Sequence, residues 1–141
     1  MAQRILIMGL PGAGKTTLAE ALKLQLEMND KKVLWLNADR IREEYNDWDF
    51  SLEGRIRQSK RMYHLSTILD CDFVIADFVA PLVEMRNNYE ADWTIWVDTI
   101  KKSRFADTDN IFIPPESSEY DFRVIEQDAE RWAKIILNII L

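Results

Sequence analysis

The stretch GLPGAGKT at residues 9–16 satisfies every fixed position of the pattern G-x-x-x-x-G-K-[ST]. Its glycines let the backbone curl so that successive N–H groups point inward and form a nest for anions. The cation of Lys15 suits the outer phosphates of a nucleotide, and the hydroxyl of Thr16 suits Mg²⁺. This loop therefore predicts a site for a nucleotide triphosphate and Mg²⁺. The residues expected to bind the nucleotide are Gly9, Leu10, Pro11, Gly12, Ala13, Gly14, Lys15, Thr16 and Thr17.

The two flanks of the loop supply the context that this motif needs. Arg4–Met8 is a short apolar run typical of a buried strand. After the loop, Leu18, Leu22 and Leu26 recur every four residues, which predicts a helix over Thr17–Leu26. A turn of purely structural role is the alternative, but the strand and the helix on either side favour phosphate binding.

Strand and helix patterns alternate along the rest of the chain. Apolar runs typical of strands lie at Val33–Leu36, Phe73–Asp77, Trp93–Asp98 and, more weakly, Asp121–Ile125. Helical patterns lie at Arg40–Glu44 with a possible Asp39 cap, from the N-cap Ser51 to Asp70, from Pro81 to about Asn87, and from Ala129 to Ile140. Residues 99–119 show no strong period and are predicted to be an irregular loop. The sequence thus predicts an α/β protein with a P-loop NTPase fold, about five parallel strands and a single domain over residues 1–141.

Composition limits the classes of partner. The net charge of -6 argues against nucleic-acid binding. Cys71 is the single cysteine, so an intrachain disulfide framework is excluded and a reducing cytoplasm is expected. No run of 18 apolar residues is present, which argues against a membrane span.

Three carboxylates follow expected strands, where ligands bind in parallel sheets. Asp39 is a candidate ligand for Mg²⁺ or a base for an attacking hydroxyl, with helix capping as the alternative. Asp77 is a candidate Walker-B-like acid that contacts Mg²⁺ directly or through water. Asp98 is a weaker candidate, since the exposed end of any strand tolerates an acid.

The helix that follows Ser51 carries a run of cations at Arg55, Arg57, Lys60 and Arg61. These residues could bind an anionic acceptor, or they could form a solvated helix face. Just before the helix, Trp48 and Phe50 either line an aromatic acceptor pocket or pack beneath the basic helix.

Four motifs in order resemble those of adenylylsulfate kinases: the P-loop, Asn37–Arg42, Phe50–Arg61 and Val79–Pro81. The resemblance implies a Mg-ATP-dependent kinase of sulfate assimilation that phosphorylates the 3′-hydroxyl of adenosine phosphosulfate (APS). It also implies a homodimer. A kinase for another nucleotide or nucleoside, and an ATP-binding regulatory module with weak transfer activity, are the alternatives; a polynucleotide 5′-end kinase is disfavoured by the acidic net charge.

The motifs carry residue roles over to this chain. The family's D-G-D-x-x-R is similar to Asn37–Arg42, its F-S-x-x-D-R-x-x-N-x-x-R is similar to Phe50–Arg61, and its I-S-P-Y-R-x-x-R is matched in part through Pro81 and Arg86. The implied catalytic residues are Lys15, Asp39 and Asp77. The implied metal ligands are Thr16, Asp39 and Asp77. The implied acceptor-binding residues are Asp39, Arg42, Phe50, Arg55 and Arg86.

The chain departs from the family pattern after Asp98, where adenylylsulfate kinases have a long basic lid. Here that lid is nearly absent, and the nearby cations are Lys101, Lys102 and Arg104. They follow the fourth strand, so we expect Arg104 to reach the ATP side of the cleft. The resemblance therefore implies a compact, lid-shortened kinase.

Overall fold

The computed structural model describes residues 2–141. Its elements are β1 (Gln3–Met8), α1 (Lys15–Met28), β2 (Val33–Asn37), α2 (Ala38–Tyr45), α3 (Leu52–Ser66), β3 (Phe73–Asp77), α4 (Val83–Tyr89), β4 (Trp93–Val97), α5 (Ala106–Ile111), the 3-10 helix η1 (Ser117–Glu119), β5 (Phe122–Val124) and α6 (Ala129–Ile140).

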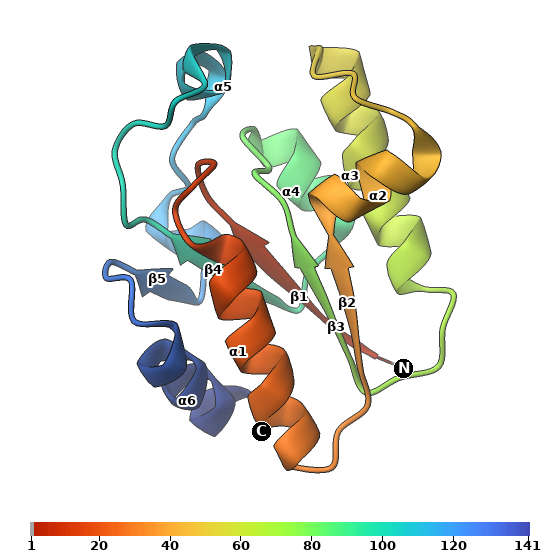
Figure 1. Cartoon of the computed structure of the whole chain (residues 1–141), viewed down its shortest axis with the longest axis vertical. Coiled ribbons are helices and arrows are strands. Elements are labelled where there is room, and N and C mark those ends of the chain that lie inside the picture. Colours follow the sequence, from red (N-terminus) through yellow and green to blue (C-terminus); the bar gives the residue numbers. More distant parts are fainter. Residues whose placement is uncertain (1) are drawn as a thin grey trace.

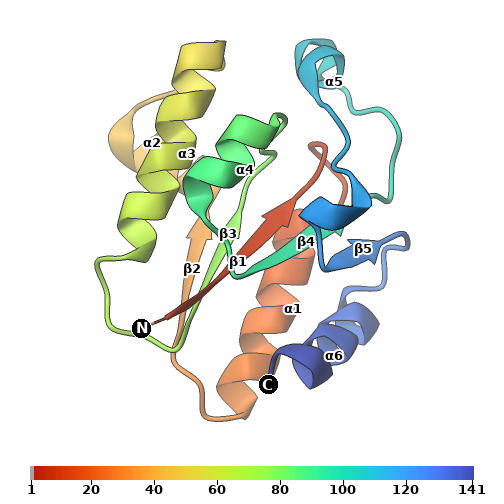
Figure 2. The ribbon, with the colours of Figure 1, turned by 180° about the vertical axis from the view of Figure 1, so that it is seen from behind.

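The strands form one five-stranded sheet in the order β2-β3-β1-β4-β5, and every neighbouring pair is parallel. The predicted five-stranded parallel α/β sheet is thereby confirmed. Helices α1 and α6 cover one face of the sheet, and α2, α3 and α4 cover the other (Figures 1 and 2). Between residues 2 and 141, no helix is both long and apolar enough to cross a membrane.

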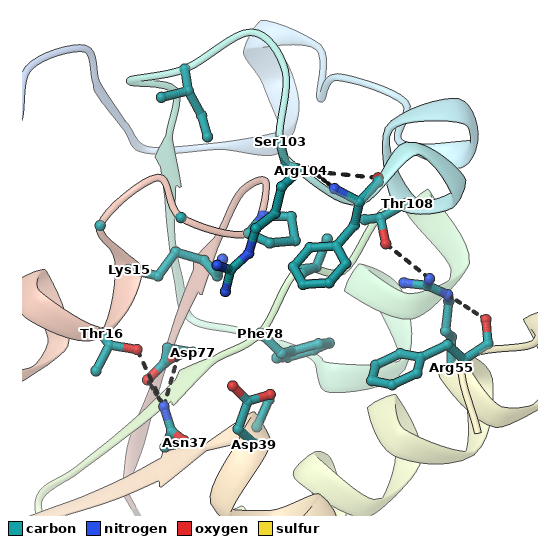
Figure 3. A pocket seen from close by; sticks show the side chains of 18 of the residues that line it. Lys15, Thr16, Asn37, Asp39, Arg55, Asp77, Phe78, Ser103, Arg104 and Thr108 are labelled. Atoms are coloured by element: carbon teal, nitrogen blue, oxygen red, sulfur yellow. Dashed lines mark hydrogen bonds between the residues drawn. The ribbon is translucent and has the colours of Figure 1, made fainter. Parts of the chain in front are cut away.

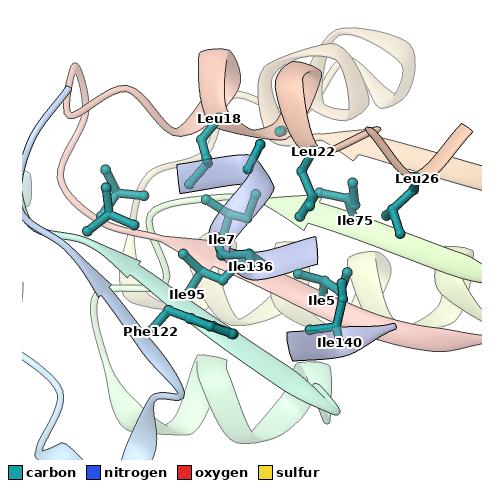
Figure 4. Packing of buried hydrophobic residues seen from close by; sticks show 14 of the residues in the cluster. Ile5, Ile7, Leu18, Leu22, Leu26, Ile75, Ile95, Phe122, Ile136 and Ile140 are labelled. Atoms are coloured by element: carbon teal, nitrogen blue, oxygen red, sulfur yellow. The ribbon is translucent and has the colours of Figure 1, made fainter. Parts of the chain in front are cut away.

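The central strand shows why the sheet needs helices on both faces. Ile5 and Ile7 are fully buried against α1 and α6, as Figure 4 shows, whereas Leu6 and Met8 are fully buried against the opposite layer. Side chains alternate along a strand, so an unbroken apolar run fills two cores. Each fully buried side chain of this kind contributes about 1.5–3 kcal/mol to folding.

Two helices begin at residues other than those expected. Asn37, not Asp39, caps α2: its Oδ1 accepts a hydrogen bond from the backbone N–H of Arg40 at 3.1 Å. The expected Asp39 cap is therefore wrong. Helix α4 begins at Val83 rather than at Pro81. The carbonyl of Pro81 instead accepts the backbone N–H of Ile113, which ties this turn to a distant part of the chain.

Helix α3 ends at Ser66, so its predicted extension to Asp70 is wrong. The hydroxyls of Ser66 and Thr67 donate to the carbonyls of Tyr63 and His64 and satisfy the last turn. Leu69, which the sequence pattern assigned to the apolar face of this helix, is 58% exposed.

The predicted irregular loop over residues 99–119 contains α5 and η1, so that prediction is wrong in its middle and at its end. Among residues 106–111, only Thr108 is buried. A six-residue helix with one buried position shows no apolar periodicity, because a repeat requires at least two inward residues.

Candidate active site

A cleft of about 1020 Å³ opens beyond the carboxyl ends of the central strands. Its walls come from the P-loop, the junction of β2 with α2, residues 48–55, the end of β3, and residues 100–108 (Figure 3). The predicted nucleotide site and much of the predicted acceptor site therefore share one cavity. We call residues 99–113 the lid segment, since they form the wall opposite the sheet.

The P-loop has the geometry of an anion nest. A Cβ at Gly9 would collide with the carbonyl oxygen of Val97, so only glycine lets the loop pass β4. Gly14 adopts φ +105° immediately before α1, and the helix then begins at Lys15. Its N-terminal N–H groups and positive dipole end are therefore available to phosphate. Of the predicted nucleotide-binding residues, those in the cleft lining are Pro11, Gly12, Gly14, Lys15, Thr16 and Thr17, whereas Gly9, Leu10 and Ala13 are not part of it.

Lys15 lies at the floor of the cleft and is only 9% exposed. Its Nζ donates to the carbonyl of Leu10 at 3.0 Å. Burial lowers the pKa of Lys15 to about 8, while the charges of Asp77 and Asp39 act in the opposite direction. A phosphate bound beside Lys15 would stabilise the charged form of its ammonium group, which burial disfavours.

An oxygen-rich group lies beside Lys15, where β2 and β3 end. Asp77 is 3% exposed and accepts hydrogen bonds from Trp35 Nε1 at 2.6 Å and from Asn37 Nδ2 at 3.2 Å. Asn37 Nδ2 also lies 3.3 Å from the hydroxyl of Thr16. Burial raises the pKa of Asp77, and these hydrogen bonds oppose the rise. Asp39 lines the same cleft, so the three predicted metal ligands are brought together.

The donor set fits Mg²⁺. A hydroxyl and one or two carboxylates suit an ion that keeps several waters and binds substrate phosphates. Residues 2–141 contain no group of three or more His, Cys, Asp or Glu side chains that would hold a metal alone. The positions of Thr16, Asp39 and Asp77 thus fit a cation that arrives with a nucleotide.

A recess of about 70 Å³ adjoins the cleft and shares Asp39, Phe50 and Arg55 with it. Two buried guanidinium groups line this recess. Arg42 Nη1 donates to the carbonyls of Asp47 and Asp49 at 2.9 and 3.1 Å, and burial lowers the pKa of Arg42. Arg55 is 7% exposed, and burial lowers its pKa as well. Both remain charged, because arginine does not deprotonate in proteins.

Phe50 belongs to both cavities and is 46% exposed. Its ring lies 4.4 Å from the guanidinium of Arg42 and 5.4 Å from that of Arg55. Trp48 packs against Phe50 and also lines the cleft. Phe50 therefore contacts both arginines and faces the cavity at the same time.

Arg86 lies outside the lining of both cavities. It is 8% exposed, and it donates to the carbonyl of Ala80 at 2.9 Å and to those of Pro81 and Ile113. Its Nη1 lies 3.5 Å from a carboxylate oxygen of Glu119. Burial lowers the pKa of Arg86. The geometry places this arginine between the β3–α4 loop and the return of the lid segment.

Other charged candidates are engaged in ion pairs. Arg57 and Arg61 each approach Asp47 to 2.8 Å, and their hydrogen bonds hold the pKa of Asp47 well below its usual range. Asp98 pairs with Arg123 at 2.7 Å and with Lys101 at 3.1 Å. These ion pairs therefore hold loops and strand ends in place.

The lid segment contributes one residue that was expected at the cleft and others that the sequence pattern missed. Arg104 points from the lid into the cleft, as expected (Figure 3). Ser103 donates its backbone N–H and its hydroxyl to Asp109, and Thr108 accepts a hydrogen bond from Arg55. Asn37 and Trp35 were also missed as partners of Asp77; the available signal was their place at the end of an expected strand.

Comparisons with known proteins relate the chain to kinases. Residues 1–101 match the family model of adenylylsulphate kinase. A probable adenylyl-sulfate kinase of Pseudomonas aeruginosa is 30% identical over 93 residues, which cover 64% of this chain and 44% of that protein. This chain therefore spans less than half the length of that relative.

Two solved structures share the fold. The APS kinase of Mycobacterium tuberculosis, solved in complex with AMPPNP and APS, has a TM-score of 0.85 at 20% identity, with 99% of this chain and 97% of that chain covered. Shikimate kinase of Acinetobacter baumannii, solved with shikimate, has a TM-score of 0.65 at 16% identity, with 99% and 93% covered. The architecture is that of P-loop NTPases, as the sequence predicted. Because the family model matches well over half of its residues, the chain belongs to the adenylylsulphate kinase family.

Proposed function

We propose that this chain transfers the γ-phosphate of ATP to the 3′-hydroxyl of APS. The observation that carries the proposal is that Asp39 lines both cavities, the cleft that holds the P-loop and the recess that holds Arg42 and Arg55. A phosphoryl donor and an anionic acceptor would meet at this carboxylate. The family match and the APS kinase of Mycobacterium tuberculosis solved with AMPPNP and APS support the same assignment.

The donor side consists of the P-loop and the start of α1. Its N–H groups hold the β- and γ-phosphates, and Lys15 and Arg104 approach the transferred group with positive charge. Thr16 and Asp77 would hold Mg²⁺, which, when bound, neutralises charge on the phosphate oxygens, and Asp39 is left to act on the acceptor. The chain's own contribution is positioning and electrostatic stabilisation.

The acceptor side consists of the recess and its aromatic rim. In the described chain, Nη2 of Arg42 and Nη1 of Arg55 have no protein acceptor, so both can bind the anionic part of the acceptor. Phe50 offers a ring face to a planar base. Asp39 then accepts the proton of the attacking hydroxyl as the new O–P bond forms and the bond to ADP breaks.

The test is product identity. The protein would be incubated with Mg-ATP and, separately, APS, AMP, adenosine or a short oligonucleotide, and the products would be identified by mass spectrometry. We expect 3′-phosphorylated APS. Asp39→Asn keeps the side chain's shape and removes its anionic charge, and we expect it to slow transfer by about 10²- to 10⁴-fold. Preferential phosphorylation of another acceptor would refute the proposed substrate, and ATP binding without any transfer would favour the regulatory module.

A further inference from the structure

We propose that Thr108 is a positioning residue for the acceptor: its hydroxyl orients Arg55, so the shortened lid forms part of the acceptor site. This inference rests on the proposed function in assigning an anionic acceptor to the recess. It assigns a role to a lid residue whose side chain accepts its hydrogen bond from Arg55.

The lid helix docks on the body of the protein through Thr108. This residue is 6% exposed and is the only buried one in α5. The helix is also joined to the preceding turn, since both carboxylate oxygens of Asp109 lie 3.1 Å from the backbone N–H of Ser103 and Oδ1 accepts its hydroxyl at 2.6 Å. Thr108 therefore presents its hydroxyl from a fixed support.

The guanidinium of Arg55 is held at two of its three nitrogens. Nε donates to the carbonyl of Phe50 at 2.8 Å, and Nη2 donates to the hydroxyl of Thr108 at 3.1 Å (Figure 3). The guanidinium is planar, so two hydrogen bonds from different elements define its orientation. Nη1 has no protein acceptor in the described chain, and Arg55 lines the recess. The fixed plane leaves one nitrogen for an incoming anion.

Asp107 makes only a minor contribution to this arrangement. Its carboxylate lies 3.8 Å from Arg55 Nη2, and its side chain is 75% exposed. An exposed ion pair at this distance is weak. The buried hydroxyl of Thr108 is therefore the lid group that determines how Arg55 is oriented.

The expected effect of losing the hydroxyl follows from the burial of Arg55. Thr108→Val keeps the shape of the side chain but leaves Nη2 without its buried acceptor, so the guanidinium can turn away from the recess. Loss of a hydrogen bond to a charged group weakens binding by about ten- to a hundredfold. We expect this loss for APS and not for ATP, because the P-loop is on the opposite wall.

The experiment compares wild type, Thr108→Val and Thr108→Ser, with Thr67→Val as a matched control. Thr67 caps α3 on the surface, outside both cavities, and loses the same hydroxyl. Calorimetry would measure APS and ATP binding separately, and steady-state kinetics would give KM and kcat for each. We expect Thr108→Val to raise the KM for APS more than it lowers kcat, Thr108→Ser to restore it, and Thr67→Val to match wild type.

The possible results separate the two proposals. Unchanged APS affinity in Thr108→Val, or equal losses for APS and ATP, would overturn the positioning role and leave the proposed function intact. If wild type does not bind APS but binds AMP or inorganic sulfate, and Thr108→Val weakens that binding, the proposed substrate fails and the positioning role holds. If wild type binds none of the three probes, both are overturned.

Discussion

Replacing Arg86 with methionine tests whether this arginine joins the lid segment to the β3–α4 loop or binds the acceptor. Arg86 donates to three backbone carbonyls, of Ala80, Pro81 and Ile113, and lies 3.5 Å from Glu119. Methionine fills much of the same volume but leaves the three carbonyls and the acid without their cation. Removing one partner of a buried charged interaction lowers the free energy of unfolding by about 3–5 kcal/mol. At about 2–4 °C per kcal/mol for a domain near this size, the melting temperature should fall by about 10 °C.

Thermal and urea unfolding of the ligand-free protein would measure this loss. Arg131→Met is the matched control, since the side chain of Arg131 is 62% exposed and its ion pair with Glu126 is long, at 4.0 Å. This substitution should lower the free energy of unfolding by less than about 1 kcal/mol. Calorimetry with APS completes the comparison. If Arg86→Met were as stable as Arg131→Met and lost APS binding alone, Arg86 would be an acceptor ligand and the structural reasoning would be refuted.

Three further predictions concern the cleft. Burial lowers the pKa of Lys15 to about 8, and bound phosphates favour its charged form. Nucleotide binding should therefore take up about half a proton at pH 8 and about a tenth of a proton at pH 7. Calorimetry in two buffers of different ionisation enthalpy would measure this proton uptake, and an unchanged pH dependence in Lys15→Met would contradict its assignment to Lys15. Arg104→Ala should lower kcat at least tenfold with ATP affinity nearly unchanged, because a lid cation acts mainly on charge that develops in the transition state. Equal losses in kcat and in ATP affinity would mean that Arg104 contributes to binding of the ground state instead. Trp35→Phe removes a 2.6 Å hydrogen bond that opposes the effect of burial on Asp77, so it should raise the pKa of Asp77 further. Carboxyl NMR titration would detect the rise, and an unshifted titration would mean that the hydrogen bond from Asn37 is sufficient.

The sheet and the P-loop were predictable because their signals are local. The apolar run of β1 is fully buried by helices on both faces, so it indicates a central strand without knowledge of its neighbours. The helix after the P-loop repeats its apolar residues every four positions, and Leu18, Leu22 and Leu26 are all in the core. In both cases a few adjacent residues carry the whole pattern.

The lid and the use of each arginine depend on contacts between distant residues. Arg55 and Arg86 both match family motifs, yet one lines the recess while the other is enclosed by carbonyls from two loops. What separates them is the set of partners: Arg55 has one nitrogen without a protein acceptor, and the donors of Arg86 are directed at Ala80, Pro81, Ile113 and Glu119. Those partners lie up to 53 residues away in sequence.

The same contacts explain how so short a lid remains ordered over the cleft. Arg55 holds it at Thr108, and Arg86 holds its return at Ile113, where the backbone N–H also bonds the carbonyl of Pro81 at 2.8 Å. A third contact joins the lid segment to the P-loop, where the hydroxyl of Thr99 donates to the carbonyl of Ala13 at 2.6 Å. A segment held at several points has less conformational freedom to lose when it closes over a ligand than a long mobile lid has. The contact with Arg55 comes from the acceptor recess. A change in the acceptor recess should therefore reach the position of Arg104, and through it the transferred phosphate, without any contact between the acceptor and the P-loop.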